Sequence, residues 1–224
     1  MQWQWLGRVP YAEALAQQAT LVAARRTNQV PDQLLLLEHP HVITLGSSAD
    51  RSHVLLDDAE RRLLGIDIFE TGRGGDVTYH GPGQLVGYPI LALAADRRDL
   101  HRYIRDLEET LIRLLADFHI GAQRHRGRTG VWVGDQKIAA IGVRVSTGWI
   151  TSHGFALNVS TDLSFFDAIV PCGIRDAGVT SIARCTGHNV AMEDVAERVA
   201  EHFAHVFGRC SDDARRRHPE RLVV

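Results

Sequence analysis

One cysteine lies in a short segment that could carry covalent chemistry. Pro171 and Gly173 flank Cys172, and a tight turn there would present the thiol and leave two backbone N–H groups free. Free N–H groups beside a nucleophile are what a tetrahedral oxyanion requires. A lone cysteine is more often a small buried hydrophobic residue. The motif alone therefore leaves a structural role open, and we assign that role to Cys185 and Cys210.

A lysine elsewhere in the sequence could activate such a thiol. A thiol of ordinary pKa, about 8.5, is mostly protonated at neutral pH, and the thiolate is the nucleophile. Lys137 follows a predicted hairpin turn at 134–136 and begins an apolar strand. Regular alternation would place it on the face of Ala139, with the small residues Ala140 and Gly142 on the opposite face, open to an apolar ligand. A solvated lysine at a strand end is the alternative.

Two further segments have features of ligand-binding sites. Five glycines lie among the twelve residues of 72–83, and glycine lets a backbone take positive φ and approach a ligand closely. Arg73 and His80 add hydrogen-bond donors to this predicted loop. In 152–159, Gly154 and Ala156 are small residues on one face of a predicted strand. A polar turn and a strand with a glycine bulge are the respective structural alternatives.

These candidates must be positioned by elements that the hydrophobic pattern predicts. Strands separated by a few helices indicate an α/β (α+β) fold, with a mixed sheet and helices packed on it in one domain spanning 1–224. The tail from about 209 is basic, and we expect it to be loose. No G-x-G-x-x-G follows a first strand, which argues against a dinucleotide-binding fold. Helices are predicted at 11–25, 57–64 (ended by Gly65), 100–118 (ended by Gly121) and 192–207, and strands at 33–39, 41–46, 66–70, 84–90, 131–133, 137–145 and 149–159.

The composition excludes several classes of function. The net charge is −2, so nothing in the overall charge favours nucleic acid. The longest aliphatic run, at 34–37, is far below the roughly 18–20 residues that cross a bilayer. The first residues lack the pattern of a secretory signal, and three cysteines do not form an even disulfide framework. We expect a cytoplasmic protein that binds neither membrane nor nucleic acid.

Five motifs together resemble one enzyme family. RGGDVTYHGPGQLVGYPI, GDQKIAAIGVRV, HGFALNV, PCGI and VTSIA follow in this order within about 34–183, and they are similar to the successive motifs of lipoyl(octanoyl) transferases. The resemblance implies the fold of biotin and lipoate protein ligases. It also implies octanoyl transfer from octanoyl-acyl carrier protein to a lysine of lipoyl domains, those of 2-oxoacid dehydrogenase complexes and the glycine cleavage H protein. No ATP, metal or cofactor would take part.

By position in the motifs, the resemblance also assigns roles to residues. Cys172 matches the nucleophile that accepts the acyl group, and Lys137 matches the lysine paired with it. His80 would orient Lys137 or donate to the thioester oxygen. The matching substrate-binding residues are Arg73, Gly74, Gly75, Asp76, Val77, Thr78, Tyr79, His80, Ala140, Ile141, Gly142, Gly154, Phe155 and Ala156.

Three other functions remain open at this point. An ATP-dependent lipoate or biotin-type protein ligase would share the fold. It would have no clear use for a nucleophilic cysteine, and the sequence has no G-x-x-x-x-G-K-[ST] loop. A metal hydrolase could use His39 with His41 or His119 with His125, but no H-E-x-x-H or C-x-x-C spacing occurs. A binding module would keep the acyl pocket without forming an acyl-enzyme.

Overall fold

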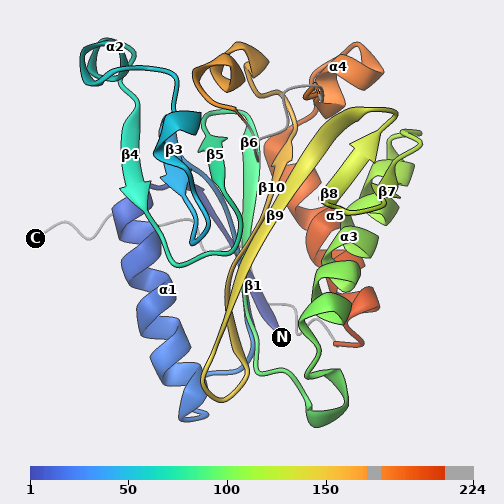
Figure 1. Ribbon diagram of the computed structural model, residues 1–224. Coiled ribbons are helices and arrows are strands. Elements are labelled where there is room, and N and C mark those ends of the chain that lie inside the picture. The colour runs from blue at the N-terminus through green and yellow to red at the C-terminus, as the bar shows by residue number, and fades with distance from the viewer. Residues whose placement is uncertain (171–177, 210–224) are drawn as a thin grey trace, which may run out of the picture.

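The computed structural model describes residues 1–170 and 178–209 of the chain. Figure 1 shows a large sheet with α1 on one face and α3 and α5 on the other. Cys172, Cys210 and all but the first residue of the predicted tail lie outside the described residues. The roles predicted for them therefore remain predictions.

The large sheet contains seven of the described strands. Its first pair, β1 and β2, is parallel, and every other neighbouring pair is antiparallel. The mixed sheet confirms the predicted fold class. In spatial order the strands are β1 (Gln2–Arg8), β2 (Gln33–Glu38), β6 (Gln84–Ile90), β10 (Ile150–Asn158), β9 (Gln136–Ser146), β8 (Arg128–Val133) and β7 (Gln123–His125).

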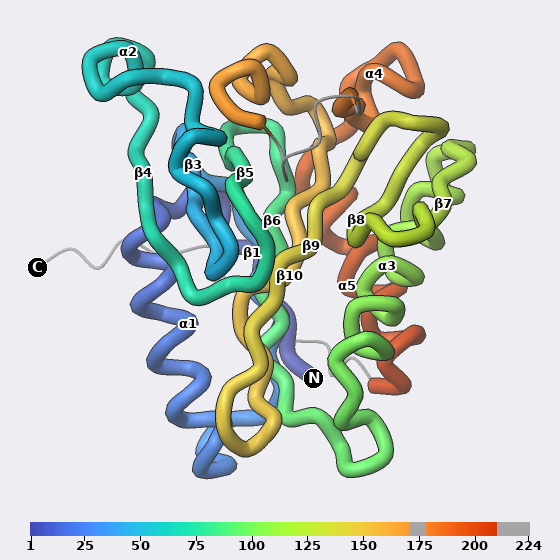
Figure 2. The backbone as a smooth tube through the Cα atoms, in the orientation of Figure 1, coloured from blue at the N-terminus to red at the C-terminus, as the bar shows by residue number. Residues whose placement is uncertain are grey.

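A second sheet of three strands lies beside the first. In spatial order it contains β4 (Asp67–Glu70), β3 (Val42–Leu45) and β5 (Val77–His80), with β3 parallel to β4 and antiparallel to β5. The chain passes from the large sheet to the small one through 39–41, between β2 and β3 (Figure 2). The two strands predicted around this turn are confirmed, but they pair in different sheets.

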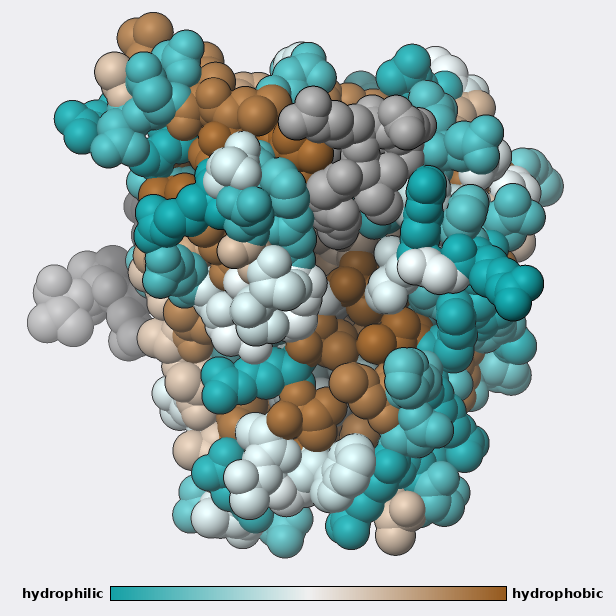
Figure 3. All heavy atoms as spheres, in the orientation of Figure 1, coloured by the Kyte–Doolittle hydropathy of each residue, from teal (hydrophilic) through white to brown (hydrophobic). Residues whose placement is uncertain are grey.

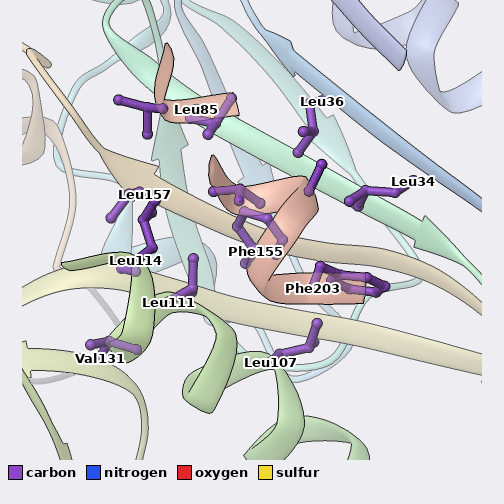
Figure 4. Packing of buried hydrophobic residues seen from close by; sticks show 14 of the residues in the cluster. Leu34, Leu36, Leu85, Leu107, Leu111, Leu114, Val131, Phe155, Leu157 and Phe203 are labelled. Atoms are coloured by element: carbon purple, nitrogen blue, oxygen red, sulfur yellow. The ribbon is translucent and has the colours of Figure 1, made fainter. Parts of the chain in front are cut away.

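The two long helices on one face of the large sheet cover its main core. These are α3 (Leu100–Asp117) and α5 (Met192–Val206). Leu107 and Leu111 of α3 are fully buried in one cluster with Phe203 of α5 and Phe155 of β10 (Figure 4). Burying one such side chain contributes about 1.5–3 kcal/mol. The helices predicted at 100–118 and 192–207 are therefore confirmed by the packing of their apolar stripes.

The opposite face of the large sheet is covered by α1 (Tyr11–Arg26), which contacts β6 and β10. Short helices complete the described chain: α2 (Asp58–Leu63), α4 (Ile182–Thr186) and three 3-10 helices, Arg51–His53, Ala95–Arg97 and Leu163–Ala168. None of the described helices combines the length and apolarity that a membrane crossing requires.

Three local predictions differ from the structure. The glycine-rich stretch is not a loop throughout, because Val77–His80 forms β5 by pairing with β3. α3 ends before Gly121, since Phe118 caps the helix and His119 takes a φ of 57°. β1, β7 and α4 were not predicted. β1 alternates tryptophan with glutamine, a period-2 pattern that is typical of a half-buried strand.

Candidate active site

A cavity of about 460 Å³ lies under the glycine-rich loop and is lined by residues of α1 and of α3, from opposite faces of the large sheet. In Figure 3 apolar side chains gather in a hollow at the centre of the molecular face, with polar residues around it. Every predicted substrate-binding residue lines this cavity except Tyr79, and Lys137 lines it too. The lining residues that had been predicted are Arg73, Gly74, Gly75, Asp76, Val77, Thr78, His80, Lys137, Ala140, Ile141, Gly142, Gly154, Phe155 and Ala156.

The glycine-rich loop packs directly on the edge of β9. β8 pairs with β9 only at 136–139, so β9 pairs with β10 alone beyond that point. The N–H of Gly74 donates to the carbonyl of Val143 at 2.9 Å. A Cβ on Gly142 would lie 2.9 Å from the carbonyl oxygen of Gly74. The absence of a side chain at Gly142 therefore allows the loop to close over this part of the cavity.

Gly75→Val should impair turnover without unfolding the protein. Gly75 has a φ of 91°, and a β-branched residue there would carry about 1–3 kcal/mol of backbone strain. The loop can relieve that strain only by shifting over the cavity. Because 1.36 kcal/mol is tenfold in rate, we expect about a tenfold or larger loss of kcat/KM. Steady-state kinetics with a urea unfolding curve would measure both effects.

Gly65→Val is the matched control for this variant. Gly65 also has positive φ, 65°, but it follows α2 and no atom lies near its Cβ position. It should lose similar stability and keep wild-type turnover. Equal turnover of the two variants would show that Gly75 is only a turn residue.

A β-bulge determines where Lys137 points. Val131 pairs with Ala139, but its neighbour Trp132 pairs with Lys137, so β9 advances two residues for one on β8. Paired residues share a face of the sheet, so Lys137 and Ala139 lie on opposite faces. The predicted parity is therefore wrong, because it assumed an unbroken strand. Lys137 instead shares the face of Ala140.

The lysine side chain lies over an aromatic ring. Lys137 Nζ is 4.8 Å from the ring centroid of Trp132, a cation–π distance, and Trp132 is fully buried. The backbone of Lys137 is fixed as well. Its N–H donates to the carbonyl of Gly178 at 2.9 Å, and its carbonyl accepts from the N–H of Thr180 at 3.0 Å. The chain that resumes after Cys172 in the sequence is thus bonded to Lys137.

A buried carboxylate on α3 supports this part of β8. Glu108 is fully buried, accepts from the N–H of Gly130 at 3.1 Å, and pairs with Arg105 at 2.6 Å and Arg124 at 3.2 Å. Gly130 lies directly against the strand of Lys137, since a Cβ on it would be 2.6 Å from the carbonyl oxygen of Ala139. Glu108 therefore fixes the strand register that orients the lysine.

Glu108→Ala should lower the free energy of unfolding by about 2–3 kcal/mol, because hydrogen bonds to charged groups contribute about 1.5–3 kcal/mol and a buried N–H loses its acceptor. Glu109→Ala is the matched control. Glu109 pairs with Arg113 and Arg124 at the surface, where such pairs contribute about 0–1 kcal/mol. Chemical denaturation of both variants would test this, and equal losses would contradict the role given to Glu108.

His80 lies buried at the back of the cavity as a neutral ring. Its Nδ1 lies 2.7 Å from Oε1 of Gln84, whose own amide group donates to the carbonyl of Tyr79 and to Asn158. Burial lowers the pKa of His80 to about 3, with the charges of His39, Arg73 and His153 adding to the effect and the Gln84 hydrogen bond opposing it. Nδ1 thus carries the proton and donates to Gln84. The lowered pKa makes the unprotonated Nε2 a weak base, so His80 is suited to positioning.

The guanidinium of Arg73 is also buried beside the loop. Nε and Nη2 donate to the hydroxyl of Thr44 at 3.1 and 2.9 Å, and Nη1 donates to the carbonyl of Gly74 at 3.2 Å. The same hydroxyl lies 3.5 Å from Nε2 of His80. Arg73, Thr44 and His80 therefore form one polar cluster that holds the glycine-rich loop against β3.

Tyr79 lies on the other side of β5. Its hydroxyl is 2.8 Å from Nδ1 of His41, and its ring stacks on Phe165. The other neighbouring histidine, His39, contacts the carbonyl of Val9 and the hydroxyl of Tyr88. No group of three possible metal ligands occurs within 1–170 and 178–209. His39 and His41 thus have separate structural contacts.

Sequence reasoning missed several residues that line the cavity. They come from α1, β6, the start of α3, the start of β8, and β10, which are far apart in the sequence. Only the tertiary fold brings them together. Val86, Tyr88 and His153 lie within the quoted motifs but were not assigned to the site, and the others lie outside those motifs. They include Tyr11, Val86, Tyr88, Leu100, Ile104, Arg128, Thr129 and His153.

Comparison with known proteins identifies relatives of the chain. Residues 10–204 match the family model of the lipoyl protein ligase A/B catalytic domain. The chain is 53% identical to the octanoyltransferase of Rubrobacter xylanophilus over 203 residues, which cover 90% of this chain and 91% of the relative.

Solved structures show the same fold. A bipartite lipoate protein ligase from Thermoplasma acidophilum, described with its E2 lipoyl domain, superposes with a TM-score of 0.69 at 16% identity, covering 97% of this chain and 87% of the other. A biotin protein ligase from Aquifex aeolicus in complex with biotin and ATP gives 0.56 at 13% identity, covering 95% and 73%. The predicted relation to the biotin and lipoate ligase fold is confirmed.

Proposed function

The chain belongs to the lipoyl protein ligase A/B catalytic domain family, and we propose that it is an octanoyltransferase of protein lipoylation that takes its acyl group from octanoyl-acyl carrier protein. The 53% identity to an octanoyltransferase over nine-tenths of the chain supports this activity. One structural observation carries the proposal for the site. Lys137 and all predicted substrate-binding residues except Tyr79 line one cavity.

The cavity suits a medium-length acyl chain. Its floor on the large sheet contains the small residues Ala140, Gly142 and Ala156, which leave room above the backbone. The glycine-rich loop covers it, and Val86 and Phe155 add apolar walls. An acyl chain enclosed in this way loses its contact with water, which contributes about 0.8 kcal/mol for each buried methylene.

The first step is a thioester exchange on Cys172. Lys137 accepts the thiol proton, and the thiolate attacks the thioester carbonyl of the donor. The tetrahedral intermediate collapses, the carbon–sulfur bond to the carrier breaks, and the departing thiolate takes the proton back from Lys137. One thioester replaces another, so no ATP is needed. Support comes from the sequence motif around Cys172 and from the bond between Lys137 and Gly178, six residues after Cys172.

The second step forms the amide. The acceptor lysine attacks the acyl-enzyme as a neutral amine, the carbon–nitrogen bond forms, and the Cys172 thiolate leaves. Lys137 is the base that removes the proton from the attacking nitrogen, a role that typically contributes about 10²–10⁴-fold. Amide formation from a thioester makes the overall reaction favourable. His80 acts through the cluster with Thr44 and Arg73, as a positioning residue for the loop.

The proposed acceptors are lipoyl domains of 2-oxoacid dehydrogenase complexes and the glycine cleavage H protein. The structural relative described with its E2 lipoyl domain supports this class of acceptor. We further propose that residues 1–224 form a single catalytic domain, that the reaction takes place in the cytoplasm, and that it needs no cofactor.

An ATP-dependent ligase of the same fold is the competing function, because the biotin ligase relative is described with ATP. The test combines the purified chain, octanoyl-acyl carrier protein and an unmodified lipoyl domain without ATP. We expect the lipoyl domain to gain one octanoyl group by mass. Modification that occurs only with free octanoate and ATP would overturn the proposal.

A further inference from the structure

Asn158 lies where three segments meet at one end of the large sheet. It is the last residue of β10, which lies between β6 and β9 (Figure 1). It pairs with Gln84, the first residue of β6. Lys137, near the start of β9, lies at the same end of the sheet, because Leu157 pairs with Ala139 across the antiparallel strands. The exposed fraction of Asn158 is 4%, so its amide group needs partners inside the protein.

The side-chain amide of Asn158 bonds to two segments that are far apart in the sequence. Its Oδ1 accepts from Nε2 of Gln84 at 3.0 Å, and its Nδ2 donates to the carbonyl of Thr180 at 3.0 Å. Gln84 and Thr180 are buried as well. A hydrogen bond in such surroundings is strong, and a group left without one is costly. The amide of Asn158 therefore fixes Thr180 relative to the start of β6.

These two bonds complete a continuous series of hydrogen bonds that reaches the backbone of Lys137. At one end, Oε1 of Gln84 lies 2.7 Å from Nδ1 of His80, which is part of the polar cluster that holds the glycine-rich loop. At the other end, the N–H of Thr180 donates to the carbonyl of Lys137 at 3.0 Å, and Val179 forms a parallel bridge with Lys137. Asn158 is the link between the two ends.

We propose that Asn158 is a positioning residue for octanoyl transfer, which holds the segment at 178–180, and through it Lys137, in a fixed place relative to His80. This inference rests on the proposed octanoyl transfer. Asn158 is not among the residues that line the cavity, so it acts through the backbone of Lys137. Since a misplacement of about 1 Å can lower a rate about 10²-fold, a small shift of that backbone is enough to affect turnover.

The test measures octanoyl transfer and amide hydrogen exchange in Asn158→Leu and Asn158→Asp. Leucine removes both bonds at a similar side-chain volume. Aspartate keeps the acceptor for Gln84, but its carboxylate has no hydrogen to donate to Thr180. We expect kcat to fall at least about tenfold in both variants, with a much smaller change in KM for octanoyl-acyl carrier protein, because the cavity lining is intact. Exchange in the peptide 178–183 should become faster, because Thr180 loses its anchor.

Thr151→Val is the matched control. Thr151 is fully buried on the same strand, where its hydroxyl accepts from the N–H of Leu91 at 2.9 Å and donates to the carbonyl of Pro89 at 2.7 Å. Valine removes both bonds and should lower the free energy of unfolding by a similar amount, measured in urea. It should leave kcat and the exchange of the peptide 178–183 unchanged.

Three results would count against the role of Asn158. A wild-type kcat in Asn158→Asp, or a loss of kcat without faster exchange at 178–183, would overturn the inference. An equal loss of kcat in Thr151→Val would overturn it too, because lower stability alone would then account for the effect. If Asn158→Leu does not fold, Asn158→Asp carries the test. If the wild-type protein transfers no octanoyl group, the proposed function fails instead, and hydrogen exchange still tests the link to Thr180.

Discussion

Lys137→Met should lower the rate of transfer to the acceptor lysine by about 10²–10⁴-fold, the usual contribution of a general base. Methionine removes the amine but keeps a long apolar stem that can lie over the ring of Trp132. The two backbone hydrogen bonds of Lys137, to Gly178 and from Thr180, do not involve its side chain. The loss should therefore reflect chemistry, and a thermal unfolding curve close to that of the wild type would confirm it.

Lys137→Arg separates charge from proton transfer. Arginine keeps the positive charge and can stack on Trp132, but it is effectively never deprotonated in proteins. Single-turnover measurements can follow acylation of the enzyme and transfer to the lipoyl domain separately. We expect acylation to survive at a reduced rate and the second step to collapse. Near-normal second-step transfer by either variant would show that Lys137 is not the base.

If Lys137 were shown not to be the base, the structure would limit which other group could accept the proton. His80 was expected from the sequence to orient Lys137 or to donate to the thioester oxygen, and it is the nearest alternative base to consider. Burial lowers the pKa of His80 to about 3, so its unprotonated Nε2 is a weak base. A different group, outside the cluster of His80, Thr44 and Arg73, would then have to accept the proton.

Cys172→Ala should abolish octanoyl transfer, because no thioester can form on an alanine. Cys185→Ala is the matched control. Cys185 lies exposed on α4, with its sulfur 3.5 Å from the hydroxyl of Thr180, and its loss should leave turnover largely intact. Initial rates of lipoyl-domain modification would measure both. Full octanoyl transfer by the Cys172→Ala protein would contradict a covalent mechanism.

The sequence predicted the long elements well because their hydrophobic periods are strong. The stripe of α3 and the apolar run of β6 (Gln84–Ile90) leave few alternatives, and both elements are present. β5 was missed because glycines surround it and its strand character comes from pairing with β3. Local composition does not indicate which strand will pair with a segment when that strand lies more than thirty residues away.

The family motifs predicted more of the candidate site than the strand alternation and glycine pattern did. Lys137 was found, but its face was assigned wrongly, because a bulge that depends on the partner strand is invisible in a parity argument. Tyr11 was missed because α1 meets β6 and β10 only in the folded protein. Tyr79 belongs to the predicted motif, yet alternation along β5 turns it towards Phe165.

The proposed mechanism depends most on the acyl-enzyme, and intact mass spectrometry tests for this intermediate directly. The wild-type protein is incubated with octanoyl-acyl carrier protein in the absence of a lipoyl domain and of ATP. We expect a mass increase of one octanoyl group, located on the peptide that contains Cys172 and lost when an unmodified lipoyl domain is added. Normal transfer to the lipoyl domain with no such adduct at any time, and with the Cys172→Ala protein equally active, would contradict it.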